Sequence, residues 1–230
     1  MEKKRYIEET RHLTQHSRTL TERELVEIEG KTFVVYPMVF NPGIFFSTRW
    51  FAGEIMQLIS DSDSFCEVGC GTGVISILAA LKHPTLNVLS VDVNEHAVEN
   101  TADNFKRFSL NKRCAVKRSD VLSTLKDDQT FDLIFWSAPF GYLNPETVVD
   151  LVDQQTFDPG YRSIELYLKQ AKQHVTSRGK ILLGFSEELA DRPLLETLCK
   201  THGYTVRLIA QETGIEVQKV TMQILELIPV

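Results

Sequence analysis

Positive charge and long apolar runs are both scarce in this sequence. Its 230 residues hold 25 Lys and Arg against 31 Asp and Glu, a net charge of −6 with a pI near 5.6. Because phosphate contacts depend mainly on Lys and Arg, this balance argues against a surface that follows long stretches of nucleic-acid backbone. No stretch approaches the roughly 18 unbroken apolar residues of a membrane span, and the residues after Met1 are polar where a signal peptide is apolar. We expect a cytoplasmic protein without membrane contact.

Cysteine is also scarce, and its placement favours free thiols. The four cysteines stand at positions 66, 70, 114 and 199. Cys66 and Cys70 flank an apolar segment, and no second cysteine pair or neighbouring histidine completes a zinc site around them. No histidine stands beside Cys70 or Cys114 in the sequence to activate a thiol. We therefore expect no metal and no cysteine nucleophile.

Strand-like and helix-like segments alternate from residue 64 onward. Residues 64–68 and 87–93 are continuous apolar runs of the kind buried on both faces of a parallel sheet, and residues 74–82 between them have helical spacing. The pattern continues with expected helices at 95–108 and 163–175 and expected strands at 115–116, 131–136 and 180–185. Such alternation predicts an α/β fold with a doubly wound, mostly parallel sheet.

Both ends of the chain differ from this alternation. Residues 204–209 and 217–228 are two strand-like runs joined by a short segment, which predicts a C-terminal antiparallel hairpin at a sheet edge. Residues 1–24 are polar with a helix expected through Tyr6 and Leu13, and residues 25–36 have the pattern of a hairpin. We expect residues 1–60 to form an N-terminal helix and hairpin extension on the substrate side, and residues 61–230 to form the main domain.

A glycine-rich turn follows the first expected strand of the main domain. It contains Gly69, Gly71 and Gly73, is preceded by Glu67, and leads into a helix. Glycines permit positive φ and close approach of a ligand to the backbone, and the free amides at the helix start meet polar groups. A nicotinamide dinucleotide fingerprint would place its third glycine where Val74 stands, so the G-x-G-x-G spacing disfavours an oxidoreductase.

Two carboxylates follow the next strands. Asp92 ends the second strand about 20 residues beyond the glycine turn, where a carboxylate accepts the hydroxyls of a bound ribose. Asp120 and Val121 follow the third strand, where they would meet an adenine. Because the carboxyl ends of parallel strands share one sheet edge, we expect these residues to line one site.

Together the glycine turn, its preceding acid and the C-terminal hairpin resemble the class I S-adenosylmethionine-dependent methyltransferases, with a seven-stranded Rossmann-like sheet, over about residues 60–230. The resemblance implies S-adenosylmethionine as the cofactor. It also implies that Glu67 and Gly69 lie near the methionine part, that Asp92 binds the ribose, and that Asp120 with the Val121 amide reads the adenine. For each acid, a plain strand-end or helix-capping role is the alternative.

The segment Ser137-Ala138-Pro139-Phe140, after the fourth strand, resembles the Asn-Pro-Pro-Tyr motif of methyltransferases that modify planar nitrogens. By this resemblance the Ser137 hydroxyl or carbonyl and the Ala138 carbonyl orient the nitrogen, and Phe140 stacks on the flat group. Three of the four positions differ from the motif, and only Pro139 is retained. A simple strand-to-loop turn is the alternative interpretation.

The region before the main domain is similar to that of glutamine N-methyltransferases and small-subunit rRNA guanine methyltransferases, which implies that Thr48 lies near the methionine end. The predicted reaction is N-methylation of a glutamine amide of a protein or of a related small-molecule nitrogen. An rRNA base is the first alternative, since a dense basic stretch at residues 106–118 would meet RNA phosphates unless it is a solvated helix end. A non-catalytic cofactor-binding protein and a nicotinamide oxidoreductase are alternatives of other classes. The sequence does not indicate an oligomeric state.

Overall fold

The computed structural model describes residues 2–215 and 219–230. Its helices are α1 (Glu2–Thr19), α2 (Ser47–Leu58), α3 (Val74–Lys82), α4 (Glu95–Arg107), α5 (Arg162–Ala171) and α6 (Arg192–Thr201). Its strands are β1 (Glu24–Ile28), β2 (Lys31–Val35), β3 (Ser64–Val68), β4 (Asn87–Asp92), β5 (Cys114–Arg118), β6 (Phe131–Ser137), β7 (Gly141–Leu143), β8 (Phe157–Pro159), β9 (Val175–Ser186), β10 (Tyr204–Ile215) and β11 (Val220–Pro229). A short 3₁₀ helix, η1 (Asp153–Gln155), lies between β7 and β8.

The central sheet has seven strands in the order β10-β11-β9-β6-β3-β4-β5. Strands β5, β4, β3, β6 and β9 are parallel, whereas β11 runs antiparallel to β9 and β10 antiparallel to β11. The predicted doubly wound sheet with its C-terminal antiparallel hairpin is therefore confirmed. The start of the second hairpin strand was predicted at Val217, which lies outside the described residues.

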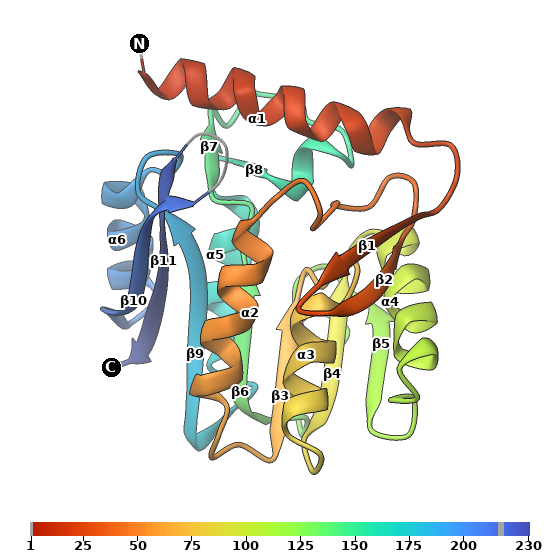
Figure 1. The fold of residues 1–230 in the computed structure, drawn as a ribbon. Helices are drawn as coiled ribbons and strands as arrows, with labels where there is room; N and C mark the ends of the chain where they lie inside the picture. Colours follow the sequence, from red (N-terminus) through yellow and green to blue (C-terminus); the bar gives the residue numbers. More distant parts are fainter. Residues whose placement is uncertain (1, 216–218) are drawn as a thin grey trace.

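Helices cover both faces of this sheet (Figure 1). Helices α2, α3 and α4 pack on one face in a core that includes Phe51, Ile77 and Phe105, while α5 and α6 pack on the other around Ile164 and Leu195. A sheet buried on both faces explains why its central strands are continuous apolar runs.

The predicted helix over 163–175 is too long. Helix α5 ends at Ala171, and strand β9 begins at Val175. The backbone carbonyl of His174 accepts a hydrogen bond of 2.8 Å from the Phe131 amide. The backbone at His174 therefore already bonds to the sheet, although the spacing of apolar side chains up to Val175 still predicts a helix.

Side-chain amides of α4 attach the N-terminal segment to the rest of the fold. On the outer edge of β2, the Val34 amide donates to Asn104 Oδ1 at 3.0 Å, and the Tyr36 amide donates to Asn100 Oδ1 at 2.8 Å. Asn104 Nδ2 also donates a hydrogen bond of 2.9 Å to the carbonyl of Thr72 in the glycine turn. One residue of α4 thus connects the N-terminal hairpin with the turn after β3.

Helix α1 crosses the top of the molecule in Figure 1, above the carboxyl ends of the parallel strands. Arg18 near its end donates to Asp150 Oδ1 at 2.7 Å and to Asp153 Oδ1 at 2.9 Å, both in the segment that joins β7 to β8. The helix is held there by ion pairs and small polar side chains such as Thr10 and Thr14, which are buried. Within the described residues, no helix has both the length and the apolar character needed to cross a membrane.

Candidate functional site

A cavity of about 650 Å³ lies at the carboxyl ends of the parallel strands. Residues from α1, the 40–48 segment, the glycine turn, the ends of β4, β5 and β6, and the β7–β8 connection all contribute to its wall. The predicted site residues that line it are Thr48, Glu67, Gly69, Gly71, Asp92, Asp120, Val121, Ser137, Ala138, Pro139 and Phe140. Gly73 does not line it. The sheet topology thus brings residues far apart in sequence to one chamber.

The glycine turn has the conformation that its composition predicts. Gly69 and Gly71 have φ values of 62° and 55°. A Cβ on Gly69 would lie 2.6 Å from Trp136 Nε1, whereas a Cβ on Gly71 would meet only the Phe40 Cβ at 3.9 Å. The backbone at Gly71 is therefore open to a ligand. Gly73 instead directly precedes α3, and the Thr101 side chain fills the space that a Cβ would occupy. Gly73 therefore supports the turn on the side that packs against α4, away from the cavity.

Asp92 is fixed at the centre of the site. Its Oδ2 accepts a hydrogen bond of 2.9 Å from the Gly71 amide, and its Oδ1 accepts one of 2.9 Å from the Asn94 amide. Burial raises the pKa of this carboxyl, and the backbone bonds oppose that rise. Each oxygen can accept a further bond, so the side chain fits the predicted contact with ribose hydroxyls.

Glu67 lines the cavity but is also engaged behind it. Its Oε2 accepts a bond of 3.0 Å from the Ser76 amide in the first turn of α3, and the Ser76 hydroxyl is bonded to the same oxygen. The Ser76 hydroxyl in turn lies 2.7 Å from the Ser90 hydroxyl. Burial raises the pKa of Glu67 to about 8, partly offset by the bonds from Ser76. The carboxyl therefore takes up a proton on folding at neutral pH.

This proton uptake predicts a pH dependence of stability. Between its usual pKa of 4.5 and the folded value of about 8, Glu67 binds a proton in the folded chain that the unfolded chain releases. The free energy of unfolding should therefore fall as pH rises through this window. Glu67→Gln is expected to make that fall shallower, measured by denaturant unfolding from about pH 5 to about pH 8. The exposed Glu187→Gln is the control, and equal slopes in all three proteins would contradict the prediction.

The turn after β5 is strained at the predicted adenine contact. Val121 is buried and has a φ of 51°, a conformation that β-branched residues rarely adopt. The turn is held by the Ser123 amide, which donates 3.0 Å to the Asp120 carbonyl, and by the Leu122 amide, which donates 2.8 Å to Gln170 Oε1. Asp120 itself is exposed at the cavity wall. Strain that neighbours enforce at a cavity is characteristic of functional positions.

The segment after β6 is held by backbone hydrogen bonds and a ring contact. The Phe140 amide donates a hydrogen bond of 2.8 Å to the Ala138 carbonyl, and the Phe140 carbonyl accepts one of 2.9 Å from the Tyr161 hydroxyl. The Phe140 ring meets Phe185 edge to face at 6.5 Å. The Ala138 carbonyl, predicted to orient the acceptor, thus already accepts one bond and has one lone pair left.

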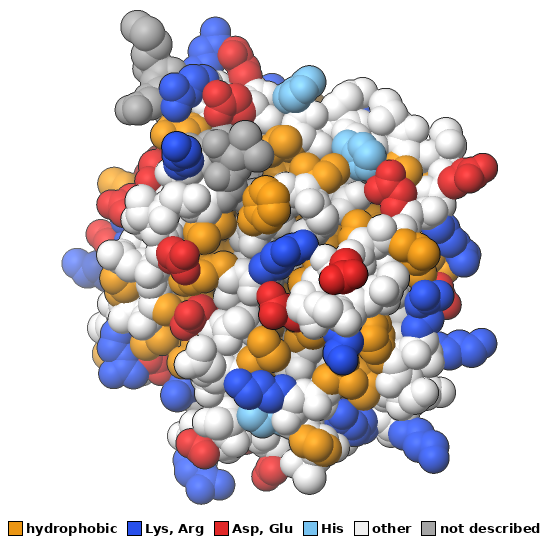
Figure 2. Space-filling view, viewed as in Figure 1, with side chains coloured by type: hydrophobic (Ala, Val, Ile, Leu, Met, Phe, Trp, Pro, Cys, Tyr) orange, Lys and Arg blue, Asp and Glu red, His pale blue; other side chains and the backbone are white. Residues whose placement is uncertain are grey.

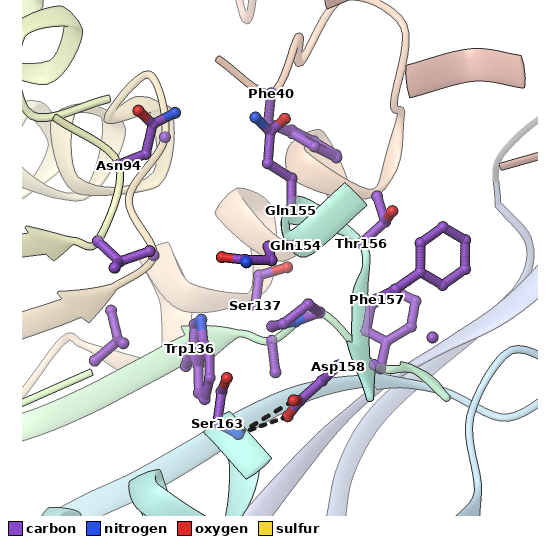
Figure 3. A pocket seen from close by; sticks show the side chains of 18 of the residues that line it. Phe40, Asn94, Trp136, Ser137, Gln154, Gln155, Thr156, Phe157, Asp158 and Ser163 are labelled. Atoms are coloured by element: carbon purple, nitrogen blue, oxygen red, sulfur yellow. Dashed lines mark hydrogen bonds between the residues drawn. The ribbon is translucent and has the colours of Figure 1, made fainter. Parts of the chain in front are cut away.

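Sequence reasoning missed one wall of the cavity. The β7–β8 connection contributes polar residues from η1 and β8, among them Gln154, Gln155 and Asp158 (Figure 3). Asp158 is buried and accepts bonds from the Ser163 and Ile164 amides, so it caps the start of α5. In the sequence, only the Asp-Pro-Gly turn at 158–160 marks this region, and it does not indicate which side chains face inward.

Comparison with known proteins identifies the family. The sequence model of the methyltransferase small domain matches residues 36–219, and the chain belongs to this family. The predicted family and the Rossmann-like methyltransferase fold are therefore confirmed.

Three curated relatives illustrate the range of similarity. A tRNA1(Val) (adenine(37)-N6)-methyltransferase of Flavobacteriaceae bacterium (strain 3519-10) is 34% identical over 38% of this chain and 37% of its own. A ribosomal protein uL3 glutamine methyltransferase of Bradyrhizobium diazoefficiens is 27% identical over 63% of this chain and 48% of its own. The ribosomal RNA small subunit methyltransferase C of Vibrio vulnificus is 26% identical over 79% of this chain and 50% of its own. The chain thus spans half or less of the length of these relatives.

Solved structures agree in fold. SMU.776, solved in complex with S-adenosylhomocysteine (SAH), has a TM-score of 0.64 at 14% identity, covering 90% of this chain and 56% of its own. A ribosomal protein L11 methylase of Lactobacillus delbrueckii subsp. bulgaricus has a TM-score of 0.53 at 15% identity, covering 83% and 81%. The family and the cavity agree with the predicted methyl donor, S-adenosylmethionine.

Proposed function

We propose that this protein transfers a methyl group from S-adenosylmethionine to a planar nitrogen, either the side-chain amide of a glutamine in a protein or a related nitrogen of a small molecule. The observation that carries the proposal is the shared chamber, in which the glycine turn with Asp92 faces the same cavity as the segment from Ser137 to Phe140. A cofactor held by the first would lie beside an acceptor held by the second.

The residues would divide the work as follows. When bound, S-adenosylmethionine supplies an electrophilic methyl group on a sulfonium. Gly71 and Asp92 hold its nucleoside, while the Ser137 hydroxyl and the free lone pair of the Ala138 carbonyl accept N–H groups of the acceptor. Phe140 offers a ring to the flat group. In-line displacement needs alignment of a nitrogen lone pair with the S–CH₃ bond, so positioning is the main contribution of the protein.

Charge favours an acceptor without phosphates. Besides Glu67, whose carboxyl is expected to be protonated near neutral pH, the cavity wall carries Asp92, Asp120, Glu146 and Asp158. Among the described lining residues, Arg162 is the single Lys or Arg. On the face shown in Figure 2, Lys and Arg side chains are interspersed with Asp and Glu. An acidic chamber repels a polyanion more than it repels a protein amide or an amine.

Several basic side chains of the stretch at 106–118 donate hydrogen bonds to backbone carbonyls within the fold. Arg113 donates to the Leu86 carbonyl at 2.8 Å, Lys117 to the Thr124 carbonyl at 2.7 Å, and Arg118 to the Val93 carbonyl at 3.1 Å. These bonds support a structural role for the stretch. An RNA base remains the second candidate acceptor, since the relatives named for tRNA and rRNA methylation favour it.

The proposal is tested with labelled S-adenosylmethionine and cell extract separated into protein, RNA and small-molecule fractions. We expect label in the protein or small-molecule fraction, at a nitrogen. Label confined to RNA would replace the first candidate with the second. Binding of SAH without transfer to any fraction would indicate a non-catalytic cofactor-binding protein.

Phe140→Ala is expected to lower the rate of methyl transfer about 10- to 100-fold, because loss of the stacking ring misaligns the acceptor. The affinity for SAH should stay within about twofold of wild type, as measured by titration calorimetry. Phe46→Ala is the control, since Phe46 is exposed and outside the cavity wall. A parallel loss of SAH binding in Phe140→Ala would mark the segment as structural.

A further inference from the structure

Gln155 occupies a junction between three segments of the cavity wall. From η1 its Nε2 donates 2.8 Å to the carbonyl of Met38, in the segment that follows β2. The same carbonyl accepts 2.9 Å from Asn94 Nδ2, just beyond the end of β4. We call Met38, Asn94 and Gln155 the clasp. It joins the N-terminal segment, the β4 end and the β7–β8 connection over one part of the cavity.

The oxygen of the Gln155 side-chain amide, Oε1, accepts no hydrogen bond from the described residues. This atom is buried and has no hydrogen-bond partner among residues 2–215 and 219–230. Turning the amide over would not correct this, because Met38 offers a carbonyl that only the NH₂ group can meet. A buried acceptor without a partner is unfavourable, so a donor from an ordered water or a bound ligand would stabilise this position.

The clasp lies at the ribose end of the predicted cofactor site. The Asn94 amide donates 2.9 Å to Asp92 Oδ1, so one residue connects the clasp to the predicted ribose carboxylate. Phe40, two residues beyond Met38, stands over Gly71, whose added Cβ would meet Phe40 Cβ at 3.9 Å. Figure 3 shows the Gln155 amide beside Phe40, and the Asn94 amide lies near it because both donate to the Met38 carbonyl. The predicted adenine contact at Asp120 and the predicted methionine contact at Glu67 lie on other strands.

We propose that Gln155 is a cofactor-positioning residue whose Oε1 accepts a hydrogen bond from a ribose hydroxyl of S-adenosylmethionine. A ribose carries two O–H donors; Asp92 would accept one of them, which leaves the other to donate to Oε1. The bound cofactor would supply the donor that Oε1 lacks, so the clasp and the glycine turn would both hold its nucleoside. This inference rests on the proposed function through the cofactor alone, and not on the acceptor.

The test is titration calorimetry with SAH on wild type, Gln155→Met and Gln57→Met. Gln155→Met should bind SAH about 3- to 10-fold more weakly than wild type, because it loses one neutral hydrogen bond. Gln57→Met is the matched control, because Gln57 is an exposed glutamine on α2 and lies outside the cavity wall. It should bind SAH as wild type does.

The ribose hydroxyl is identified by repeating the titrations with SAH that lacks the 2′-hydroxyl and with SAH that lacks the 3′-hydroxyl. For one of the two, wild type and Gln155→Met should bind equally, since the bond is absent in both. Equal SAH affinity of wild type and Gln155→Met overturns the inference, as does a loss of the same size for all three ligands. If methionine lowers the unfolding temperature without ligand, Gln155→Asn takes its place. Failure of wild type to bind SAH would overturn the proposed function as well.

Discussion

Asp92→Ala is expected to weaken SAH binding by about 1 to 3 kcal/mol. Two effects act together. The variant loses charge-assisted bonds to the ribose, and it leaves the Gly71 and Asn94 amides without the oxygens that they donate to at 2.9 Å. The second effect loosens the glycine turn before any ligand arrives. Titration calorimetry measures the loss directly.

The control for Asp92→Ala is Asp61→Ala, an exposed acid outside the cavity wall, which should bind SAH as wild type does. Asp92→Asn should be intermediate, since one amide oxygen replaces two carboxylate oxygens. An unchanged affinity in Asp92→Ala would remove Asp92 from the cofactor site.

Gly69→Ala is expected to lower the free energy of unfolding by about 2 to 5 kcal/mol. The added Cβ is strained at a φ of 62° and would lie 2.6 Å from Trp136 Nε1. Left-handed strain contributes about 1 to 2 kcal/mol and overpacking about 1 to 3 kcal/mol. Denaturant unfolding measures the change.

Two further variants separate strain from clash. Gly53→Ala in α2 meets no atom within 4 Å and should stabilise the helix by about 0.5 to 1 kcal/mol. Trp136→Phe removes the indole nitrogen, so the double variant with Gly69→Ala should lose less than the sum of the single losses. A Gly69→Ala protein as stable as wild type would show that the turn relaxes freely.

The grouping of the glycine turn and Asp92 at one cavity was predictable because its sequence signals are local. Gly69 and Gly71 stand within one turn, and Asp92 ends the next apolar run, so strand assignment alone places them together. Parallel topology then brings Ser137 to the same edge. The structure adds that Glu67 is shared between the cavity wall and Ser76 in α3.

The rest of the site depends on contacts between distant segments. Gln155 reaches Met38 across more than half of the chain, and no periodicity marks either residue. The sheet of β7 and β8 was missed because three-residue strands carry almost no pattern. Helix α6 was missed although Asp191 caps it and Pro193 opens its first turn, a recognisable start signal.

The side-chain amides along β2 bear on solubility. A two-stranded sheet leaves rows of backbone donors and acceptors at its rim, which can recruit another chain and begin aggregation. Asn100 and Asn104 occupy that rim at Val34 and Tyr36, in place of a third strand. Apolar replacements at these two asparagines would reopen the rim to intermolecular pairing even where the folded core is intact.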